Sequence, residues 1–158
     1  MCCPFREALM KRIANAAWKG SVRLGEGTVS TSSGVISRLI YTAGANSGDI
    51  PCITPTEMLA AAEASCIAVS VAREFEKESI SFDSIETKAE VNIEARKKAP
   101  EITGIHLDVT VHATDTDSAV IEKALHRAKQ HCIITRNLSC KVTMTTHVNV
   151  ANGVAATA

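Results

Sequence analysis

Apolar and polar positions alternate along much of this chain, and the alternation predicts several strands. The clearest example runs from Ile105 to Ala113, where every second residue is apolar and the residues between them, His106 among them, are polar. A period of two is typical of a strand with one buried face. Shorter versions of the pattern predict the other strands, over 85–95 and 142–150 and in a hairpin over 16–33.

Two segments show helical patterns instead. A helix is predicted to begin at Pro55, a residue suited to the first helical turn, and to stay apolar on nearly every side until Arg73. A helix of that kind is normally buried, and Cys66 lies in its middle. A second helix is predicted over 115–131, with Cys132 directly after it. The element order β-β-α-β-β-α-β places the chain in class α+β, with helices packed against antiparallel sheet.

The amino-acid composition and net charge argue against some classes of function. The 158 residues carry 17 basic and 17 acidic side chains, and only 3% are aromatic. A zero net charge and few stacking side chains argue against a nucleic-acid partner. The sequence shows neither a secretory signal nor an apolar run of the roughly 20 residues that span a bilayer, so no membrane partner and a cytoplasmic location are expected.

Cysteine is the most informative residue type, because a cytoplasmic thiol stays reduced unless chemistry uses it. No C-x-x-C motif is present, so neither a thioredoxin-type site nor a zinc site is supported. Cys66 taken alone fits a small core residue. Cys132 is expected to begin a short helix over 133–138, where free N–H groups and the helix dipole would stabilise a thiolate. The other cysteines are interpreted as incidental: Cys2, Cys3, Cys52 and Cys140.

Metal and cofactor sites are not predicted. His106 and His112 are about 20 Å apart along their strand, too far to share an ion. His126 and His131 point to different sides of their helix, and His131 beside Cys132 is a weak zinc signal. No glycine-rich phosphate loop occurs.

Four segments together resemble the OsmC/Ohr family, the osmotically inducible and organic-hydroperoxide-resistance proteins. The segment T-P-T-E-M-L-A-A-A-E-A-S-C, residues 54–66, is similar to the family's N-P-E-E/Q-L-x-x-A-x-x-A-C. The other three keep the family's order and spacing: A-x-W-x-G at 16–20, G-x-G-x-V-S-T-x-S-G at 25–34 and H-C-I-I-T-R-N-L at 131–138. The resemblance covers residues 16–150 and is closer to the OsmC branch.

The resemblance implies a cysteine-based peroxidase. Cys66 would attack the O–O bond of a small hydroperoxide and become a sulfenic acid, and Cys132 would condense with it to a disulfide. An external dithiol such as dihydrolipoamide, or a lipoyl-bearing protein, would restore both thiols. The family fold implies an intertwined homodimer, in which antiparallel sheets surround two central helices. The expected organisation is an N-terminal arm over 1–15, the OsmC-like domain over 16–150 and a disordered tail over 151–158.

The chain departs from the family pattern at two functional positions. The family's glutamate, ten residues before the first cysteine, is replaced by Thr56, and an ungapped alignment puts Asn46 where its arginine is expected. Glu63 shares a helix face with Thr56 and is a candidate substitute, but its carboxylate would need a cation such as Arg38 or Arg136. The alternative is that Glu63 is a paired or solvated carboxylate at a dimer seam.

Two other functions stay open. The chain can be an OsmC-like fold without peroxidase activity that binds a small apolar or thiol-containing ligand at the dimer interface. An apolar pocket around Cys66 without a cation would favour this interpretation, and a cation near the sulfur would favour the enzyme. A purely structural dimeric domain would leave Cys66 and Cys132 far apart and closed to solvent.

Overall fold

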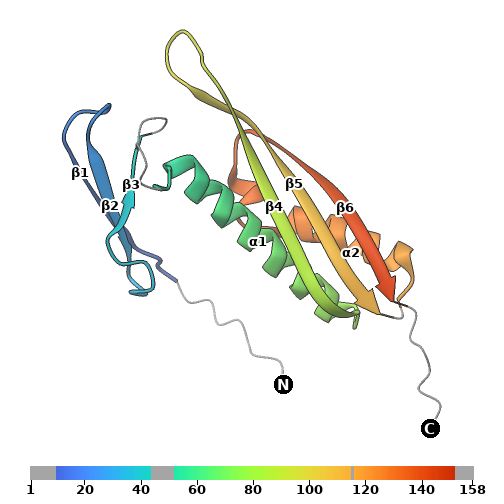
Figure 1. Cartoon of the computed structure of the whole chain (residues 1–158). Helices are drawn as coiled ribbons and strands as arrows, with labels where there is room; N and C mark the ends of the chain where they lie inside the picture. The colour runs from blue at the N-terminus through green and yellow to red at the C-terminus, as the bar shows by residue number, and fades with distance from the viewer. Residues whose placement is uncertain (1–9, 44–51, 115, 152–158) are drawn as a thin grey trace. The chain divides into compact units, whose positions relative to one another are not determined.

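The computed structural model describes residues 10–43, 52–114 and 116–151, which form two compact units. The first unit contains the described residues up to Pro55, and the second contains those from Thr56 onward. Figure 1 shows the elements of each unit. Residues 1–9 of the expected arm, residues 152–158 of the expected tail and Asn46 lie outside the described residues.

The first unit is built on a three-stranded antiparallel sheet in the order β1-β2-β3. Its strands are β1 (Ala14–Lys19), β2 (Glu26–Thr31) and β3 (Leu39–Tyr41). The predicted hairpin is confirmed as β1 and β2, whereas β3 is too short to give a periodic signal in the sequence. Gly27 lies opposite Tyr41, and a Cβ at position 27 would collide with the Tyr41 ring, so the pairing of β2 with β3 requires glycine there.

The second unit contains two helices and a second three-stranded sheet, in the order β4-β5-β6. Both helices lie against one face of this sheet (Figure 1). The elements are α1 (Pro55–Lys77), β4 (Ser81–Glu94), β5 (Glu101–Thr114), α2 (Ser118–His131), the 3-10 helix η1 (Thr135–Asn137) and β6 (Lys141–Ala151). The two helices, the long strands and class α+β are therefore as predicted.

The second sheet differs from the wholly antiparallel sheet that was expected. β4 and β5 are antiparallel, but β6 runs parallel to β5, with Ile105 opposite Val142. A parallel neighbour needs a long crossover, and the chain uses α2 and η1 for that purpose. The crossover brings Cys132 back towards α1.

The core of the second unit lies between the helices and the sheet. The buried side chains of β5 alternate along the strand, as its sequence predicts, and the polar side chains between them face away from the helices. α1 and α2 each contribute one apolar face to the same cluster. The fully buried members from these three elements are Ile67, Val71, Phe75, Ile105, Leu107, Val109, Val111, Ala113, Ile121, Ala124, Leu125 and Ala128.

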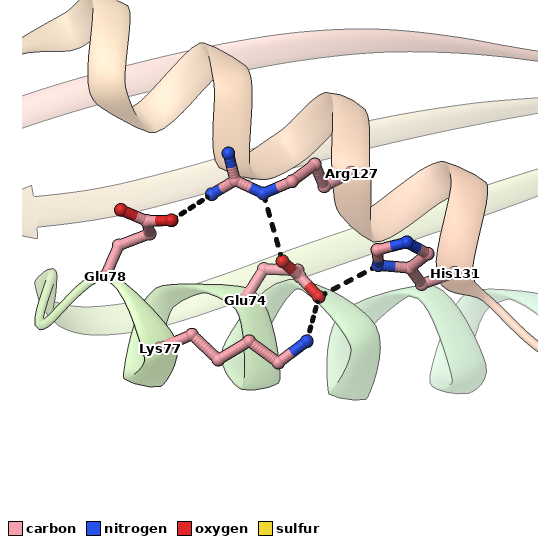
Figure 2. Close-up of polar contacts among 5 residues, drawn as sticks. All are labelled: Glu74, Lys77, Glu78, Arg127 and His131. Carbon is pink, nitrogen blue, oxygen red and sulfur yellow. Dashed lines mark hydrogen bonds and ion pairs between the residues drawn. The ribbon is translucent and has the colours of Figure 1, made fainter.

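A buried carboxylate joins the two helices. Glu74 of α1 accepts hydrogen bonds from Arg127 Nε at 3.2 Å and from Lys77 Nζ at 2.6 Å, and it lies 3.1 Å from His131 Nδ1 (Figure 2). Arg127 also donates to Glu78 at 2.6 Å. The hydrogen bond from Lys77 is the main cause that lowers the pKa of Glu74 to about 2, against the opposing effect of burial. The charge of Glu74 therefore stabilises the packing of α1 against α2.

Candidate active site

The structure brings Cys66 and Cys132 together. Cys66 lies in the middle of α1, and Cys132 follows the last residue of α2. The Cys132 thiol donates a hydrogen bond to the Cys66 sulfur, with 3.2 Å between the two Sγ atoms, although 66 residues separate the cysteines along the chain. Both are free thiols. A purely structural domain with its cysteines far apart is therefore the wrong description.

The local backbone around Cys132 differs from the prediction. Cys132 caps the C-terminus of α2, and its N–H donates to the carbonyl oxygen of Ala128 at 2.9 Å. Only the three-residue helix η1 follows, and it starts at Thr135. Cys132 thus does not begin a helix, and the helix-dipole stabilisation expected for its thiolate is absent from this geometry. The apolar stretch Ile133–Ile134 passes over α1 instead of forming a regular helix.

Cys66 is held mainly as a thiol. Burial raises the pKa of the Cys66 thiol above its ordinary value, and the neighbouring Cys132 raises it further. Hydrogen bonds from the backbone of Ile134 and Ile133 act in the opposite direction and lower this pKa. These backbone groups, rather than a side-chain cation, are the contacts that favour the Cys66 thiolate in the described part of the chain.

An open pocket of about 400 Å³ gives access to Cys66. Its lining is mainly apolar and comes from α1 and from the residues that follow Cys132: Ala62, Ser65, Cys66, Val69, Ser70, Arg73, Ile133 and Ile134. Arg73 is its one charged lining residue, two helical turns beyond Cys66 and about 10 Å further along α1. Cys132 is fully buried and does not line the pocket. A reagent that enters the pocket therefore meets Cys66 first.

Glu63 lies one turn before Cys66 and is also fully buried. Its Oε1 accepts a hydrogen bond from the hydroxyl of Thr135, and its Oε2 has no partner among the described residues. Among the described residues of the second unit, no ion pair joins Glu63 to Arg136 or to another cation. The Thr135 hydroxyl takes that place, and Glu63 is neither solvated nor at an exposed seam of this chain.

The other described cysteines are also free thiols. Cys140 is partly buried and packs against the core of the second unit, and Cys52 is a partly buried residue of the first unit. Cys2 and Cys3 lie outside the described residues. The described part of the chain contains no group of three or more His, Cys, Asp or Glu side chains arranged to hold a metal ion. None of its helices is long and apolar enough to span a membrane.

Four residues of the site, Ile133, Ile134, Thr135 and Arg73, are not predicted from the sequence. The backbone groups of Ile133 and Ile134 carry no side-chain signal, so only the structure identifies them. Thr135 gives a usable signal, because it follows Cys132 by three residues just as Glu63 precedes Cys66 by three. Arg73 is visible as the start of the charged part of α1, but nothing in its spacing assigns it to a pocket.

The site consists of two thiols in contact on an α+β scaffold. One is reached from a pocket and the other is buried behind it, so the chain is a protein with a paired-cysteine site. A family model described as OsmC-like protein matches residues 46–147, and the chain belongs to this family. The resemblance of the four sequence segments to this family is thereby confirmed.

Similar proteins agree with this assignment. The peroxiredoxin OsmC of Escherichia coli is 27% identical over 129 residues, which are 82% of this chain and 90% of that protein, and the peroxiredoxin OsmC of Shigella flexneri matches equally well. Among solved structures, an OsmC-like protein from Vibrio cholerae has a TM-score of 0.72 at 19% identity, covering 87% of this chain and 99% of its own. The organic hydroperoxide resistance protein OhrB of Bacillus subtilis has a TM-score of 0.65 at 18% identity, covering 90% of this chain and 100% of its own. These structures support the fold.

Proposed function

We propose that the protein is a thiol peroxidase that reduces organic hydroperoxides, and hydrogen peroxide as a smaller substrate, through Cys66 and Cys132. The observation that carries the proposal is the 3.2 Å contact between the two sulfurs, with Cys66 on the wall of an open, mainly apolar pocket. Membership of the OsmC-like family and relatives named peroxiredoxin support the same class of reaction.

The reaction proceeds in two steps at the paired sulfurs. The Cys66 thiolate attacks the terminal oxygen of the hydroperoxide, the O–O bond breaks, and the alkoxide takes up a proton and leaves as an alcohol. Cys66 is then a sulfenic acid. The Cys132 sulfur attacks the Cys66 sulfur, the S–O bond breaks, and water leaves as the disulfide forms. An external dithiol, such as dihydrolipoamide or a lipoyl-bearing protein, reduces the disulfide and is itself oxidised.

The contacts of Cys66 suggest how the first step is assisted without the family's arginine and glutamate. The backbone groups of Ile133 and Ile134 stabilise the thiolate. Preorganised backbone donors of this kind need no side-chain reorganisation when negative charge develops on sulfur or oxygen. The apolar pocket walls favour a hydroperoxide with an organic group over hydrogen peroxide.

The same proposal includes a homodimer and a cytoplasmic location. On α1, Ala61, Ser65 and Val69 form an exposed row at four-residue spacing, and Ser65 and Val69 also line the pocket. Val69 is 58% exposed and Ile133, on the same pocket wall, is 68% exposed. Exposed large apolar side chains beside small ones fit burial against a second copy. The second copy would then supply part of the wall around Cys66.

Peroxide consumption by the purified, reduced protein tests the enzyme. With cumene hydroperoxide and dihydrolipoamide, the wild type is expected to turn over, and Cys66→Ser is expected to lose turnover because its hydroxyl is not a comparable nucleophile. Cys140→Ser is the matched control, since it removes a partly buried thiol away from the pocket. A wild type that consumes no hydroperoxide, or equal rates in wild type and Cys66→Ser, would overturn the proposal.

One observation favours a second candidate function, the binding of a small apolar or thiol-containing ligand without turnover. Burial raises the pKa of Cys66, which is unfavourable for a peroxidase but harmless in a binding pocket. This candidate predicts saturable binding of such a ligand that Val69→Asp abolishes, while one equivalent of hydroperoxide leaves both thiols reduced. Rapid oxidation of Cys66 would exclude it.

A further inference from the structure

The buried Glu63 carboxylate needs an explanation that the two thiols alone do not give. Its side chain is fully buried, and one of its two oxygens has no partner among the described residues. Removing a carboxylate from water is unfavourable unless hydrogen bonds or charges compensate for it. The one compensating contact that the structure gives Glu63 is the hydroxyl of Thr135. An apolar residue would fill the same space at lower cost, so the carboxylate points to a specific role.

Glu63 and Thr135 lie at matching distances along the chain from the two cysteines. Glu63 is three residues before Cys66 on α1, and Thr135 is three residues after Cys132. Residues three apart on a helix are neighbours on its surface, so the carboxylate lies one turn from the Cys66 thiol. The side chains of the same two segments therefore meet at two points, in a sulfur–sulfur contact and in a carboxylate–hydroxyl hydrogen bond.

The segment after α2 has little regular structure to fix it. Its backbone bonds are local, from Arg136 to the Cys132 carbonyl at 3.1 Å and from Asn137 to the Ile134 carbonyl at 2.9 Å. The Asn137 side chain also bonds within the segment, to the carbonyl of Ile133 at 2.7 Å. None of these bonds reaches α1. The bond from Thr135 to Glu63 does, and it therefore helps, beside the backbone groups of Ile133 and Ile134 that contact Cys66, to set where Cys132 lies relative to Cys66.

We propose that Glu63 is a positioning residue that acts through Thr135 to hold Cys132 within reach of Cys66 for disulfide formation. The inference rests on the proposed function for its biological meaning, but the geometry of disulfide formation is independent of peroxide. In the step concerned, the Cys132 thiol and the Cys66 sulfenic acid combine to form the S–S bond and release water. If Cys132 is displaced, the sulfenic acid persists and a second molecule of hydroperoxide oxidises it to sulfinic acid.

Substitutions at Thr135 separate the hydrogen bond from simple packing. Thr135→Val keeps the shape of the side chain and removes the hydroxyl, whereas Thr135→Ser keeps the hydroxyl. After treatment with a small excess of cumene hydroperoxide, the ratio of Cys66 sulfinic acid to Cys66–Cys132 disulfide is expected to rise about tenfold in Thr135→Val, the size expected for loss of one hydrogen bond to a buried charged group. Thr135→Ser is expected to restore the wild-type ratio, and Glu63→Gln to stay close to it because its amide oxygen still accepts.

Thr87 provides a control for general destabilisation. Its hydroxyl donates to the carbonyl oxygen of Ala64 at 2.9 Å, so it is another threonine anchored on α1, but from β4. Thr87→Val makes the same change of side chain and removes a hydrogen bond to α1 without touching the segment after Cys132. It is expected to keep the wild-type ratio of sulfinic acid to disulfide. An equal rise in Thr87→Val and Thr135→Val would show that the effect is only structural, and would overturn the inference.

Oxidation by diamide distinguishes failure of this inference from failure of the proposed function. Diamide forms disulfides between nearby thiols without any peroxidase chemistry, so the Cys66–Cys132 disulfide is expected to form more slowly in Thr135→Val than in Thr135→Ser even if no hydroperoxide is consumed. Equal diamide rates in these two variants overturn the role of Glu63. If Thr135→Val does not fold, the same comparison is made at the acceptor of the hydrogen bond, with Glu63→Leu against Glu63→Gln. Equal diamide rates in that pair likewise overturn the role of Glu63.

Discussion

At the scale of single residues, the reactivity of Cys66 depends on a competition that the structure makes visible. Burial and the adjacent Cys132 favour the thiol, and the backbone groups of Ile134 and Ile133 favour the thiolate. Burial is the largest of these effects, so the balance favours the thiol. Since the thiolate is the nucleophile, Cys66 is expected to react slowly at neutral pH in the single chain, where it is mainly a thiol.

This balance predicts how the reaction of Cys66 depends on pH. The alkylation rate of Cys66 by iodoacetamide, followed by mass spectrometry of its peptide, is expected to rise with pH and to reach half its maximum above the ordinary pKa of cysteine. The sign follows because a raised pKa means that more alkaline solution is needed to form the thiolate. An unfolded peptide containing residues 60–72 serves as the reference. A midpoint for the folded protein below that of the peptide would contradict this balance, because it would mean that the groups favouring the Cys66 thiolate outweigh burial.

The two cysteines that the structure brings into contact could be singled out from the sequence, but their environment could not. The segments around Cys66 and Cys132 resemble those of the OsmC/Ohr family, and that resemblance is what singles out the pair, because Cys66 taken alone fits a small core residue. Glu63 stands out in the sequence as a carboxylate in need of a cation, but its partner is the Thr135 hydroxyl. Hydrogen bonds across the chain depend on where α2 ends, and the sequence predicts a helix start at Cys132 where the structure has a helix end.

At the scale of elements, α1 and α2 carry the two cysteines, and their packing keeps the sulfurs together. Glu74 stabilises this packing through Arg127 and His131 of α2 and Lys77 of α1 (Figure 2). Its side chain is only 3% exposed, whereas that of Lys77 is 54% exposed. Solvent therefore screens part of the attraction, and the cluster is worth less than the pKa shift of Glu74 alone would indicate.

The lowered pKa of Glu74 predicts a loss of stability in acid. A carboxylate with a pKa of about 2 in the folded chain and 4.5 as its ordinary value stabilises the fold fully above the higher value. The unfolded chain binds the proton first as the pH falls, so this stabilisation decreases from pH 4.5 and is lost near pH 2. The expected change in the free energy of unfolding is roughly 2 kcal/mol after allowance for screening.

Urea unfolding between pH 2 and 6 measures this effect. Glu74→Gln is expected to be less stable than the wild type at pH 6 and to approach it as the pH falls. Glu76→Gln removes an exposed carboxylate from the same helix and is expected to keep the wild-type pH dependence. Parallel curves for wild type and Glu74→Gln would contradict the account of this cluster.

The long helices and strands with a periodic pattern could be predicted from the sequence. The shortest strand and the direction in which strands pair could not. β5 is a strand of 14 residues whose alternation is visible in the sequence, and the apolar run of α1 is equally clear. β3 has only three residues, which is too short for a period to be recognised. The parallel pairing of β5 with β6 depends on the path taken by α2 and η1, and a strand's own sequence does not record its direction relative to a neighbour.

At the scale of the whole molecule, the account depends on the second unit, whose two helices and mixed sheet bring together thiols that are 66 residues apart in the chain. The family assignment and the fold are independent of the chemistry. The peroxidase proposal instead requires that the contact between Cys66 and Cys132 be used in a reaction. Both proposed steps, the reaction with hydroperoxide and the reduction by a dithiol, change the oxidation state of this same pair, so that state reports on the central claim.

The most direct measurement is the mass of the intact, reduced protein after one equivalent of cumene hydroperoxide, followed by peptide mapping without reduction. The account predicts that the protein loses two hydrogens, that the loss maps to a disulfide between Cys66 and Cys132, and that a dithiol restores the original mass. Unchanged thiols at Cys66 and Cys132, or oxidation that maps to Cys52 or Cys140 instead, would contradict it.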